Sequence, residues 1–476
     1  MPKPTLLLLA LLAGRLAAAA QAAPPAEEYL LLGNASRGSG EPMLAVDPTN
    51  PRNVIVVGMG SLHKLSDAPV SRSMVDAYHA TPNSTYTWLG VTHNGGRTWK
   101  VGELPILKDP KFTRCPDPFA AVTPQGTFLA GCEPRETAGD FFGGSYMVVS
   151  TDKGDTWGPP VPIVTSYARA RFAPGLKPRI GGNSPWDRPF LRIDDSTGVI
   201  YGQGGGGQTD IDQKPGVYRL QSYLTASTDG GKSFGTIYAW DSLQYPQLGR
   251  GDFDAAHGVV AEVYEASKVP ASQHATCPCV VFGLSHNQGQ SFQYHVLPQV
   301  TPPPVRLGPP PELRGNFPGA GGPGGLRLVA DQNHAGRFFL MQARLHRLQL
   351  SSTDDYGKTW SAWASTTPVP NTEIAKPWIS ESPQGVLGIM WRAISRDGSY
   401  EIWSVISRDG GQSFSAPLRV SHAPSPLRYP ARDVGWFGDD VQDLVLDGHS
   451  TYMVWGDSRA GFLGTWYAHV PLADYH

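Results

Sequence analysis

The stretch STDKGDTW at residues 150–157 decides the fold, because its pattern recurs along the chain. The pattern has Ser or Thr first, Asp or Asn third, Gly fifth, Ser or Thr seventh, and Trp or Phe last. Five further copies occupy residues 92–99, 227–234, 285–292, 353–360 and 407–414. A unit that recurs every few tens of residues is typical of solenoids and propellers.

Each copy has the chemistry of a β-hairpin turn. The Asp or Asn, such as Asp152, can accept hydrogen bonds from nearby backbone N–H groups, and the Gly, such as Gly154, supplies a position with positive φ. The closing aromatic residue, such as Trp157, can pack between neighbouring units. Six such turns in order therefore predict an all-β propeller with about one turn per blade.

These turns resemble the Asp-box, or BNR repeat, of the sialidase superfamily, and the resemblance covers nearly the whole chain after its N-terminal segment. In that family the box joins the third and fourth strands of a propeller blade and has a structural role. The resemblance therefore implies a carbohydrate-active propeller, in which the aspartates of the boxes neither catalyse nor bind metal.

A second repeated element is a short apolar strand that usually begins with a charged residue and Pro. Six copies precede the turns and a seventh follows the last one: 41–46, 117–122, 187–191, 254–259, 326–329, 376–379 and 439–445. The seventh unit ends after its third strand at 464–470, and the apolar segment 28–32 can supply the missing fourth strand. Such closure removes free strand edges. We expect a seven-bladed β-propeller closed by an N-terminal strand, with a six-bladed ring as the alternative.

The N-terminal segment has the features of a secretory signal peptide, predicted over residues 1–22. Lys3 precedes an apolar run at 6–12, and Ala20 and Ala22 are small residues of the kind a signal peptidase reads. No later segment approaches the ~20 apolar residues that a membrane helix needs. We expect an extracellular or periplasmic protein whose residues 23–476 form a single domain, with the Pro- and Gly-rich run 301–325 as a loop between blades.

Composition and charge narrow the partners. The chain has 55 Gly and 44 Pro, and only 17% of its residues are charged, which favours short strands joined by tight turns. A net charge of -2 disfavours nucleic acid and anionic membranes, whose protein partners normally carry a basic excess. We expect a monomer without a cofactor.

The four cysteines suggest one disulfide and no metal site. Cys115 and Cys132 flank a predicted strand pair and are close enough to meet across it, so a bridge between them and two free thiols are about equally expected. The Cys277-Pro278-Cys279 segment is too tight for a zinc knuckle, which needs two residues between its ligands.

The alternation of strand direction within a blade places the candidate site. The start of the first strand, the end of the second and the loop that follows it share one rim, which we call the first rim, and the repeated turns lie on the opposite rim. Because the inner strands converge on the axis, charged and aromatic residues at the first rim are the candidates. Those that we take to bind substrate are Glu41, Arg188, Arg344, Lys376, Trp378 and Arg392.

The sialidase resemblance also implies catalytic roles. Three arginines, here Arg188, Arg344 and Arg392, would hold a substrate carboxylate in bidentate hydrogen bonds. A carboxylic acid, Asp117 or Asp187, would protonate the leaving group. The Tyr–Glu nucleophile pair would be Tyr264 with Glu265, or Tyr400 with Glu401.

Three functions remain open, in this order. The first is a glycoside hydrolase that removes terminal sugars from a polysaccharide or glycoconjugate. The second is a polysaccharide lyase acting on uronate polymers, for which His257, Tyr264 and Arg188 are the required residue types. The third is a binding propeller without catalysis, which is favoured by Gly40-Glu41-Pro42 standing where sialidases usually carry Arg-Ile-Pro.

Overall fold

The structure is a computed structural model. It describes residues 27–62, 85–136, 144–165, 171–174, 186–207, 220–240, 244–248, 251–300, 325–344, 346–426 and 441–476. The predicted signal peptide at 1–22 and nearly all of the predicted loop at 301–325 lie outside these residues.

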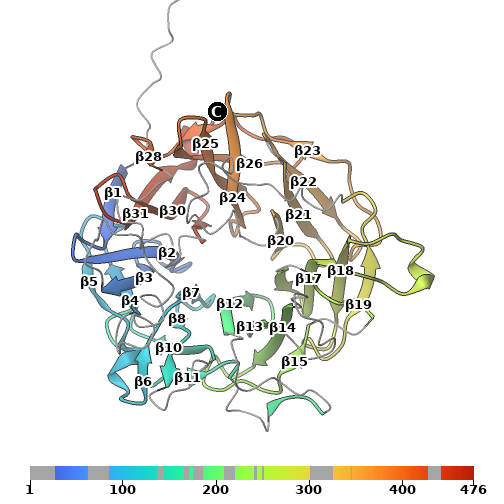
Figure 1. Cartoon of the computed structure of the whole chain (residues 1–476), viewed down its shortest axis with the longest axis horizontal. Helices are drawn as coiled ribbons and strands as arrows, with labels where there is room; N and C mark the ends of the chain where they lie inside the picture. The colour runs from blue at the N-terminus through green and yellow to red at the C-terminus, as the bar shows by residue number, and fades with distance from the viewer. Residues whose placement is uncertain are drawn as a thin grey trace, which may run out of the picture.

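Seven sheets are arranged in a ring around a central axis, as Figure 1 shows. The chain therefore folds as a seven-bladed β-propeller, and the six-bladed alternative is wrong. The first three blades are β2 (Arg37–Val46), β3 (Val54–Leu62), β4 (Thr85–Thr92) and β5 (Lys100–Glu103); β7 (Phe119–Val122), β8 (Phe128–Cys132), β10 (Tyr146–Ser150) and β11 (Val161–Pro162); and β12 (Trp186–Asp194), β13 (Val199–Gly207), β14 (Leu220–Ser227) and β15 (Tyr238–Ala239).

Blades 4 to 6 follow the same order from the axis outward. They are β16 (Asp252–Ala256), β17 (Val259–Ala266), β18 (Cys279–Ser285) and β19 (Gln293–Val296); β20 (Leu326–Ala330), β21 (Phe338–Ala343), β22 (Leu348–Thr353) and β23 (Ala364–Ser365); and β24 (Thr372–Glu381), β25 (Leu387–Ser395), β26 (Ser399–Ser407) and β27 (Leu418–Arg419), with β28 (Ser425–Pro426) beside β26. A separate hairpin joins β6 (Phe112–Arg114) to β9 (Arg135–Glu136).

The seventh blade combines the two ends of the described chain. β29 (Asp443–Leu446), β30 (Ser450–Asp457) and β31 (Gly464–Pro471) form its inner three strands, and β1 (Glu27–Leu32) is the fourth. β1 pairs antiparallel with β31, from Glu27 opposite His469 to Leu32 opposite Thr465. The predicted closure by an N-terminal strand is confirmed.

An ion pair and a backbone hydrogen bond, both made by Glu28, stabilise the closing strand β1. The carboxylate of Glu28 accepts hydrogen bonds from the Arg459 guanidinium, and the backbone N–H of His422 donates to it at 2.9 Å. The Glu28 side chain is 1% exposed, and Arg459 also pairs with Asp457 at 2.8 Å. The seventh blade is therefore held by charge as well as by its strand ladder.

The six repeated turns connect the third and fourth strands of blades 1 to 6 and share one set of hydrogen bonds. In each, the backbone N–H of the Gly donates to the first Ser or Thr at 2.8–3.2 Å. The N–H of the second Ser or Thr donates to the Asp or Asn carboxyl or amide oxygen at 2.9–3.1 Å. The carboxylates of Asp152, Asp229 and Asp355 thus satisfy their own turns, and these hydrogen bonds lower their pKa to about 2.

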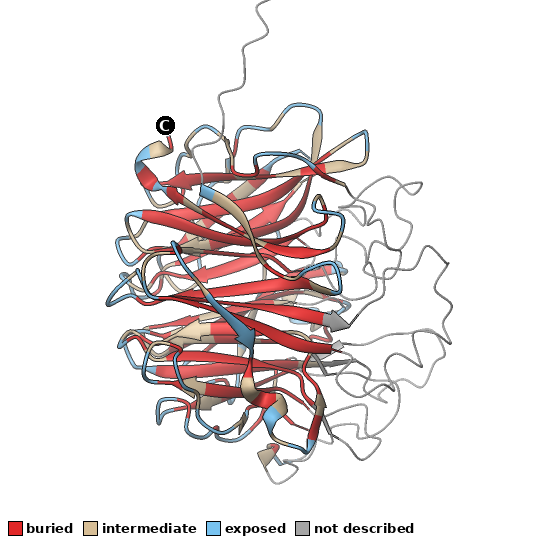
Figure 2. Ribbon diagram, turned by 90° about the vertical axis from the view of Figure 1, so that its left-hand side faces the viewer, coloured by how far each residue is buried: buried red, intermediate tan, exposed pale blue. Residues whose placement is uncertain are grey.

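Most strands are largely buried, while exposed residues gather in the connecting turns and in outer strands such as β5 (Figure 2). The turns between first and second strands share their rim with the repeated turns, and the second-to-third loops lie on the opposite rim. Among the described residues no helix is long and apolar enough to cross a membrane. Short 3-10 helices lie at η1 (Pro105–Lys108), η3 (Ala271–Gln273) and η6 (Leu472–Asp474).

Both pairs of cysteines are bonded. Cys115 is joined to Cys132, with Cα atoms 5.4 Å apart, so that the segment before β7 is tied to the end of β8. Cys277 is joined to Cys279 across a single residue, a bond that the sequence analysis did not anticipate. Among the described residues no group of His, Cys, Asp or Glu could hold a metal ion.

Candidate functional site

Three residues of the inner-strand segments share one unusual backbone conformation: Glu41 in the middle of β2, Lys376 in the middle of β24, and Asp117 just before β7. Glu41, Asp117 and Lys376 have φ values of 47°, 50° and 48°, and each is followed by Pro. The ladder with the second strand shifts register beside Glu41 in blade 1 and beside Lys376 in blade 6. We call these three the bulge residues, because each stands where its inner strand leaves regular β geometry.

A left-handed backbone is unfavourable for residues with a Cβ, by roughly 1–2 kcal/mol. Glycine adopts it freely, and blade 5 has Gly325 at the equivalent position with φ of 72°. Gly325 precedes Asp331 by the same number of residues as Glu41 precedes Asp47. Blades 1, 2 and 6 therefore keep a charged side chain where the backbone alone favours glycine.

The surroundings hold the bulge residues firmly. Glu41 is 4% exposed and Lys376 is 2% exposed, while Asp117 is half-buried. Ahead of Asp117, the Cys115–Cys132 bridge and a 2.9 Å hydrogen bond from the Glu133 N–H to the Pro116 carbonyl fix the chain. The bulge residues thus hold two carboxyl groups and an ammonium group at defined positions toward the first rim, with only Asp117 partly exposed, and this chemistry suits polar or acidic ligands.

Behind the bulge residues lies a cavity of about 250 Å³ on the axis, lined by the inner strands of all seven blades. Its charged residues are Arg192, Asp195, Asp254, Glu381 and Asp443. Burial raises the pKa of Asp254 and of Asp443 to about 6, while the nearby Arg192 guanidinium acts in the opposite direction.

The axial carboxylates have a structural role that accounts for their position. An inner strand has one edge without a neighbouring strand, and side chains of the adjacent blade bond that edge. The Asp443 carboxylate accepts the N–H of Leu44 in blade 1 at 3.0 Å. Asp254 of blade 4 accepts the N–H of Ala330 in blade 5 at 2.9 Å. These acids therefore link neighbouring blades by hydrogen bonds. Because this structural role explains their position, we do not count them among the catalytic candidates.

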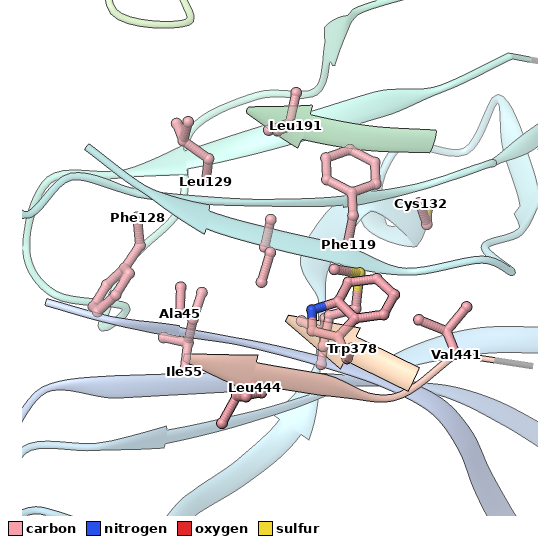
Figure 3. Close-up of a cluster of buried hydrophobic side chains, with 14 of the residues drawn as sticks. Ala45, Ile55, Phe119, Phe128, Leu129, Cys132, Leu191, Trp378, Val441 and Leu444 are labelled. Carbon is pink, nitrogen blue, oxygen red and sulfur yellow. The ribbon is translucent and has the colours of Figure 1, made fainter. Parts of the chain in front are cut away.

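Trp378 belongs to the core. It is 5% exposed and lies in the same buried hydrophobic cluster as Phe119 and Leu191, which come from two other inner strands (Figure 3). The Arg327 guanidinium lies 4.1 Å from the centre of its ring. This cation–π contact covers a ring face that we had expected to contact sugar.

Two predicted arginines lie in different settings. Arg392 is fully buried; its Nε donates to Gln442 at 3.1 Å, and Gln442 donates through Nε2 to the Lys376 carbonyl at 2.6 Å. Arg392 therefore supports the bulge at Lys376 from behind. Arg344 follows β21 at the first rim, where burial lowers the pKa of its guanidinium. The side chains of Asp187 and Arg188 lie outside the described part of the chain.

The structure does not bring Tyr264 and Glu265 together. The two are consecutive in the regular strand β17, so their side chains point to opposite faces of the sheet. Tyr264 is fully buried, and its hydroxyl donates to the Tyr245 carbonyl at 3.0 Å. The same alternation separates Tyr400 from Glu401 in β26. Burial raises the pKa of Glu265.

A Tyr–Glu contact does exist elsewhere in blade 4. Tyr294 lies across β18 from Glu262, and Gly283 between them leaves room for the ring and carboxyl group to meet. The Tyr294 hydroxyl donates to the Trp240 carbonyl, and burial raises its pKa far above the ordinary value. The raised pKa keeps the Tyr294 phenol neutral. Tyr294 lies on β19, the outermost strand of blade 4, so its contact with Glu262 lies away from the axis.

The sequence singles out Glu41, Asp117 and Lys376 as candidates, and their functional roles stay predictions; it does not indicate the contacts that support them. Gln442 bonds the Lys376 carbonyl, and Gly325 takes the position in blade 5 that corresponds to the bulge residues. Their signal in the sequence is their offset from the turn that follows each inner strand.

The fold and the site define a seven-bladed propeller with charged residues at its first rim. No protein-family model matches the chain, and no curated protein sequence matches it. Three similar solved structures are a protein of unknown function from Dyadobacter fermentans (13% identity, TM-score 0.48, covering 80% of this chain and 97% of that one), a Hadza microbial sialidase (15%, 0.46, 82% and 74%) and the GH93 α-L-arabinofuranosidase of Fusarium graminearum with arabinobiose (15%, 0.43, 81% and 97%). At these identities the similarity concerns the fold alone.

Proposed function

We propose that the protein is a secreted carbohydrate-active propeller, a sialidase-like glycoside hydrolase that removes terminal sugars from a polysaccharide or glycoconjugate. The observation that carries this proposal is the backbone of the bulge residues. Glu41, Asp117 and Lys376 have left-handed backbones in the part of the ring toward the first rim, and such strained positions cluster at active sites and ligand-binding sites.

The proposed roles follow from exposure and charge. Asp117 is the half-buried carboxyl group among the bulge residues, and it acts as the general acid that protonates the leaving oxygen. Lys376 and Glu41 bind polar groups of the terminal sugar. Arg188, which holds the matching place in blade 3 of the sequence pattern, completes the set with a guanidinium suited to a substrate carboxylate.

Export is part of the proposal. It rests on the signal-peptide features of residues 1–22 and on the two disulfides, because such bonds persist in oxidising compartments. Mass spectrometry of the protein recovered from culture medium or periplasm tests it. A mature N-terminus near Ala23 supports export, and an intact N-terminus in the cytoplasmic fraction contradicts it.

Activity is tested with aryl sialosides, other aryl glycosides and uronate polymers, following both released phenol and ultraviolet absorbance. We expect phenol release that Asp117→Asn reduces by about 100-fold or more, since general acid catalysis contributes about 10²–10⁴. The matched control is Asp355→Asn on the opposite rim, a change that two other repeated turns, with Asn94 and Asn287, already contain.

The other outcomes separate the competing functions. A rise in ultraviolet absorbance with uronate polymers identifies a lyase, and glycan binding without any turnover identifies a binding propeller. Equal activity of the Asp117→Asn and Asp355→Asn variants removes Asp117 from the mechanism.

A further inference from the structure

A second pocket opens on the first rim, between blades 5 and 6, with a volume of about 310 Å³. Three segments form it: the turn after β21, the connection that leads into β24, and the turn after β25. All three connect strands at the first rim. We call it the rim pocket. Its volume lies at the lower end of the roughly 300–1,000 Å³ that small-molecule pockets span.

The lining of the rim pocket has two chemical parts. Val369, Pro370 and Ile394 provide an apolar wall, and Ile394 is 4% exposed. His346 and Arg396 provide polar groups, and both side chains are exposed. A sugar ring has the same two parts, an apolar face of C–H groups and an edge of hydroxyls.

The hydrogen-bonding capacity of the polar part suits hydroxyl groups. The Nδ1 atom of His346 lies 2.9 Å from the Thr372 carbonyl, which can only accept, so the neutral imidazole carries its proton on Nδ1. Its Nε2 is then an acceptor. Glu373 adds carboxylate acceptors and Arg396 adds guanidinium donors. Because the pocket combines a cationic donor with an anionic acceptor, it suits neutral hydroxyl groups, which donate and accept, better than it suits an anionic group.

The rim pocket and the bulge residue Lys376 share the strand β24. Glu373 and Lys376 belong to the same strand, β24, and lie about 10 Å apart at ~3.3 Å per residue. The turn that carries His346 also carries Arg344, whose N–H donates to the Arg347 carbonyl at 2.9 Å. One sugar ring cannot touch both places, but neighbouring units of one chain can.

We propose that the rim pocket binds a neutral sugar unit of the substrate beyond the terminal one, so that the substrate class is an oligosaccharide or polysaccharide rather than a simple glycoside. This inference rests on the proposed function. The bulge residues hold the terminal sugar, and the rim pocket holds a following unit on the leaving-group side.

The kinetic test compares two substrates with the same terminal sugar, an aryl glycoside and an oligosaccharide. The variant is Arg396→Ala, and the matched control is Arg52→Ala, which removes an exposed arginine on the opposite rim. We expect Arg396→Ala to lower kcat/KM for the oligosaccharide about 10-fold and to leave the aryl glycoside unchanged. Equal losses on both substrates, or no loss on either, overturn the inference.

A binding test separates this inference from the proposed function. Calorimetry uses cello-, xylo-, malto- and mannohexaose as probes, with the wild-type protein and with Asp117→Asn to prevent turnover. If the protein hydrolyses nothing, the proposed function fails, and the rim pocket stands if Arg396→Ala or Glu373→Gln weakens hexasaccharide binding about 10-fold while Arg52→Ala does not. If no hexasaccharide binds, or if all variants bind alike, the rim pocket inference fails whatever the activity.

Discussion

Replacement of Asp117 by Gly and by Ala tests the strain assigned to the bulge residues. Asp117 has φ of 50° and is followed by Pro, and its side chain is half-buried. Both substitutions remove the carboxyl group, and both are expected to abolish catalysis. They differ in the Cβ atom, which is the source of the left-handed strain.

The magnitude follows from two opposing effects. Ala in a left-handed conformation is disfavoured by roughly 1–2 kcal/mol, and Gly avoids this. Gly loses about 0.5–1 kcal/mol relative to Ala, because its unfolded chain has more freedom. The Asp117→Gly variant should therefore be more stable than Asp117→Ala by about 0.75 kcal/mol, the difference between the midpoints of these two ranges.

The control lies in β7, four residues further along the chain, at Ala121, whose φ is negative. There Ala121→Gly should be less stable than the wild type by about 0.5–1 kcal/mol, so the preference between Gly and Ala reverses between position 117 and position 121. Urea-induced unfolding followed by tryptophan fluorescence measures each difference. The reasoning is refuted if Asp117→Ala is as stable as Asp117→Gly, or if the order is the same at both positions.

Three further predictions concern stability. Burial beside Asp331 raises the pKa of Glu381 to about 8, so the folded state holds the Glu381 proton more tightly than the unfolded state does. The free energy of unfolding should therefore fall as the pH rises from about 4.5 to about 8, by up to about 1.4 kcal/mol per pH unit. Glu381→Gln should flatten that slope in unfolding curves measured across the range. Cys132→Ser should lower the free energy of unfolding by about 3 kcal/mol, because the Cys115–Cys132 bridge joins two residues with a sequence separation of 17. An unchanged midpoint of denaturant unfolding would show that the bridge is dispensable. Glu28→Ala should cost about 3 kcal/mol in the same assay through loss of a buried ion pair, and a cost below 1 kcal/mol would show that closure rests on the strand ladder alone.

The sequence predicts the ring because its signals are local. Each repeated turn carries its own hydrogen-bond partners, so the pattern at 150–157 is sufficient to place a turn wherever it occurs. The closing strand was predicted at 28–32 and is observed at Glu27–Leu32. These features need only the residues of one segment and a count of strands.

The site was harder to predict because its supports come from other blades. Nothing near Lys376 in the chain indicates that Gln442 bonds its carbonyl, or that Arg392 orients Gln442. The Tyr264–Glu265 pair failed for a reason that the sequence does contain, since consecutive residues of a strand face opposite sides. Left-handed φ values at charged residues are not visible in composition or spacing, although the repeated charge–Pro dipeptide marks their places.

The closing strand also constrains how the chain folds. Glu27 and His469 pair although they lie about 440 residues apart, and a loop of that length costs about 5 kcal/mol of chain entropy to close. Blades 1 to 6 each form from contiguous chain, whereas the seventh waits until β31 has emerged and the distant β1 returns to it. Until then β31 presents an unpaired edge that the β1 of another molecule can occupy. A substitution that weakens closure should therefore lead to strand-exchanged dimers before it leads to unfolding.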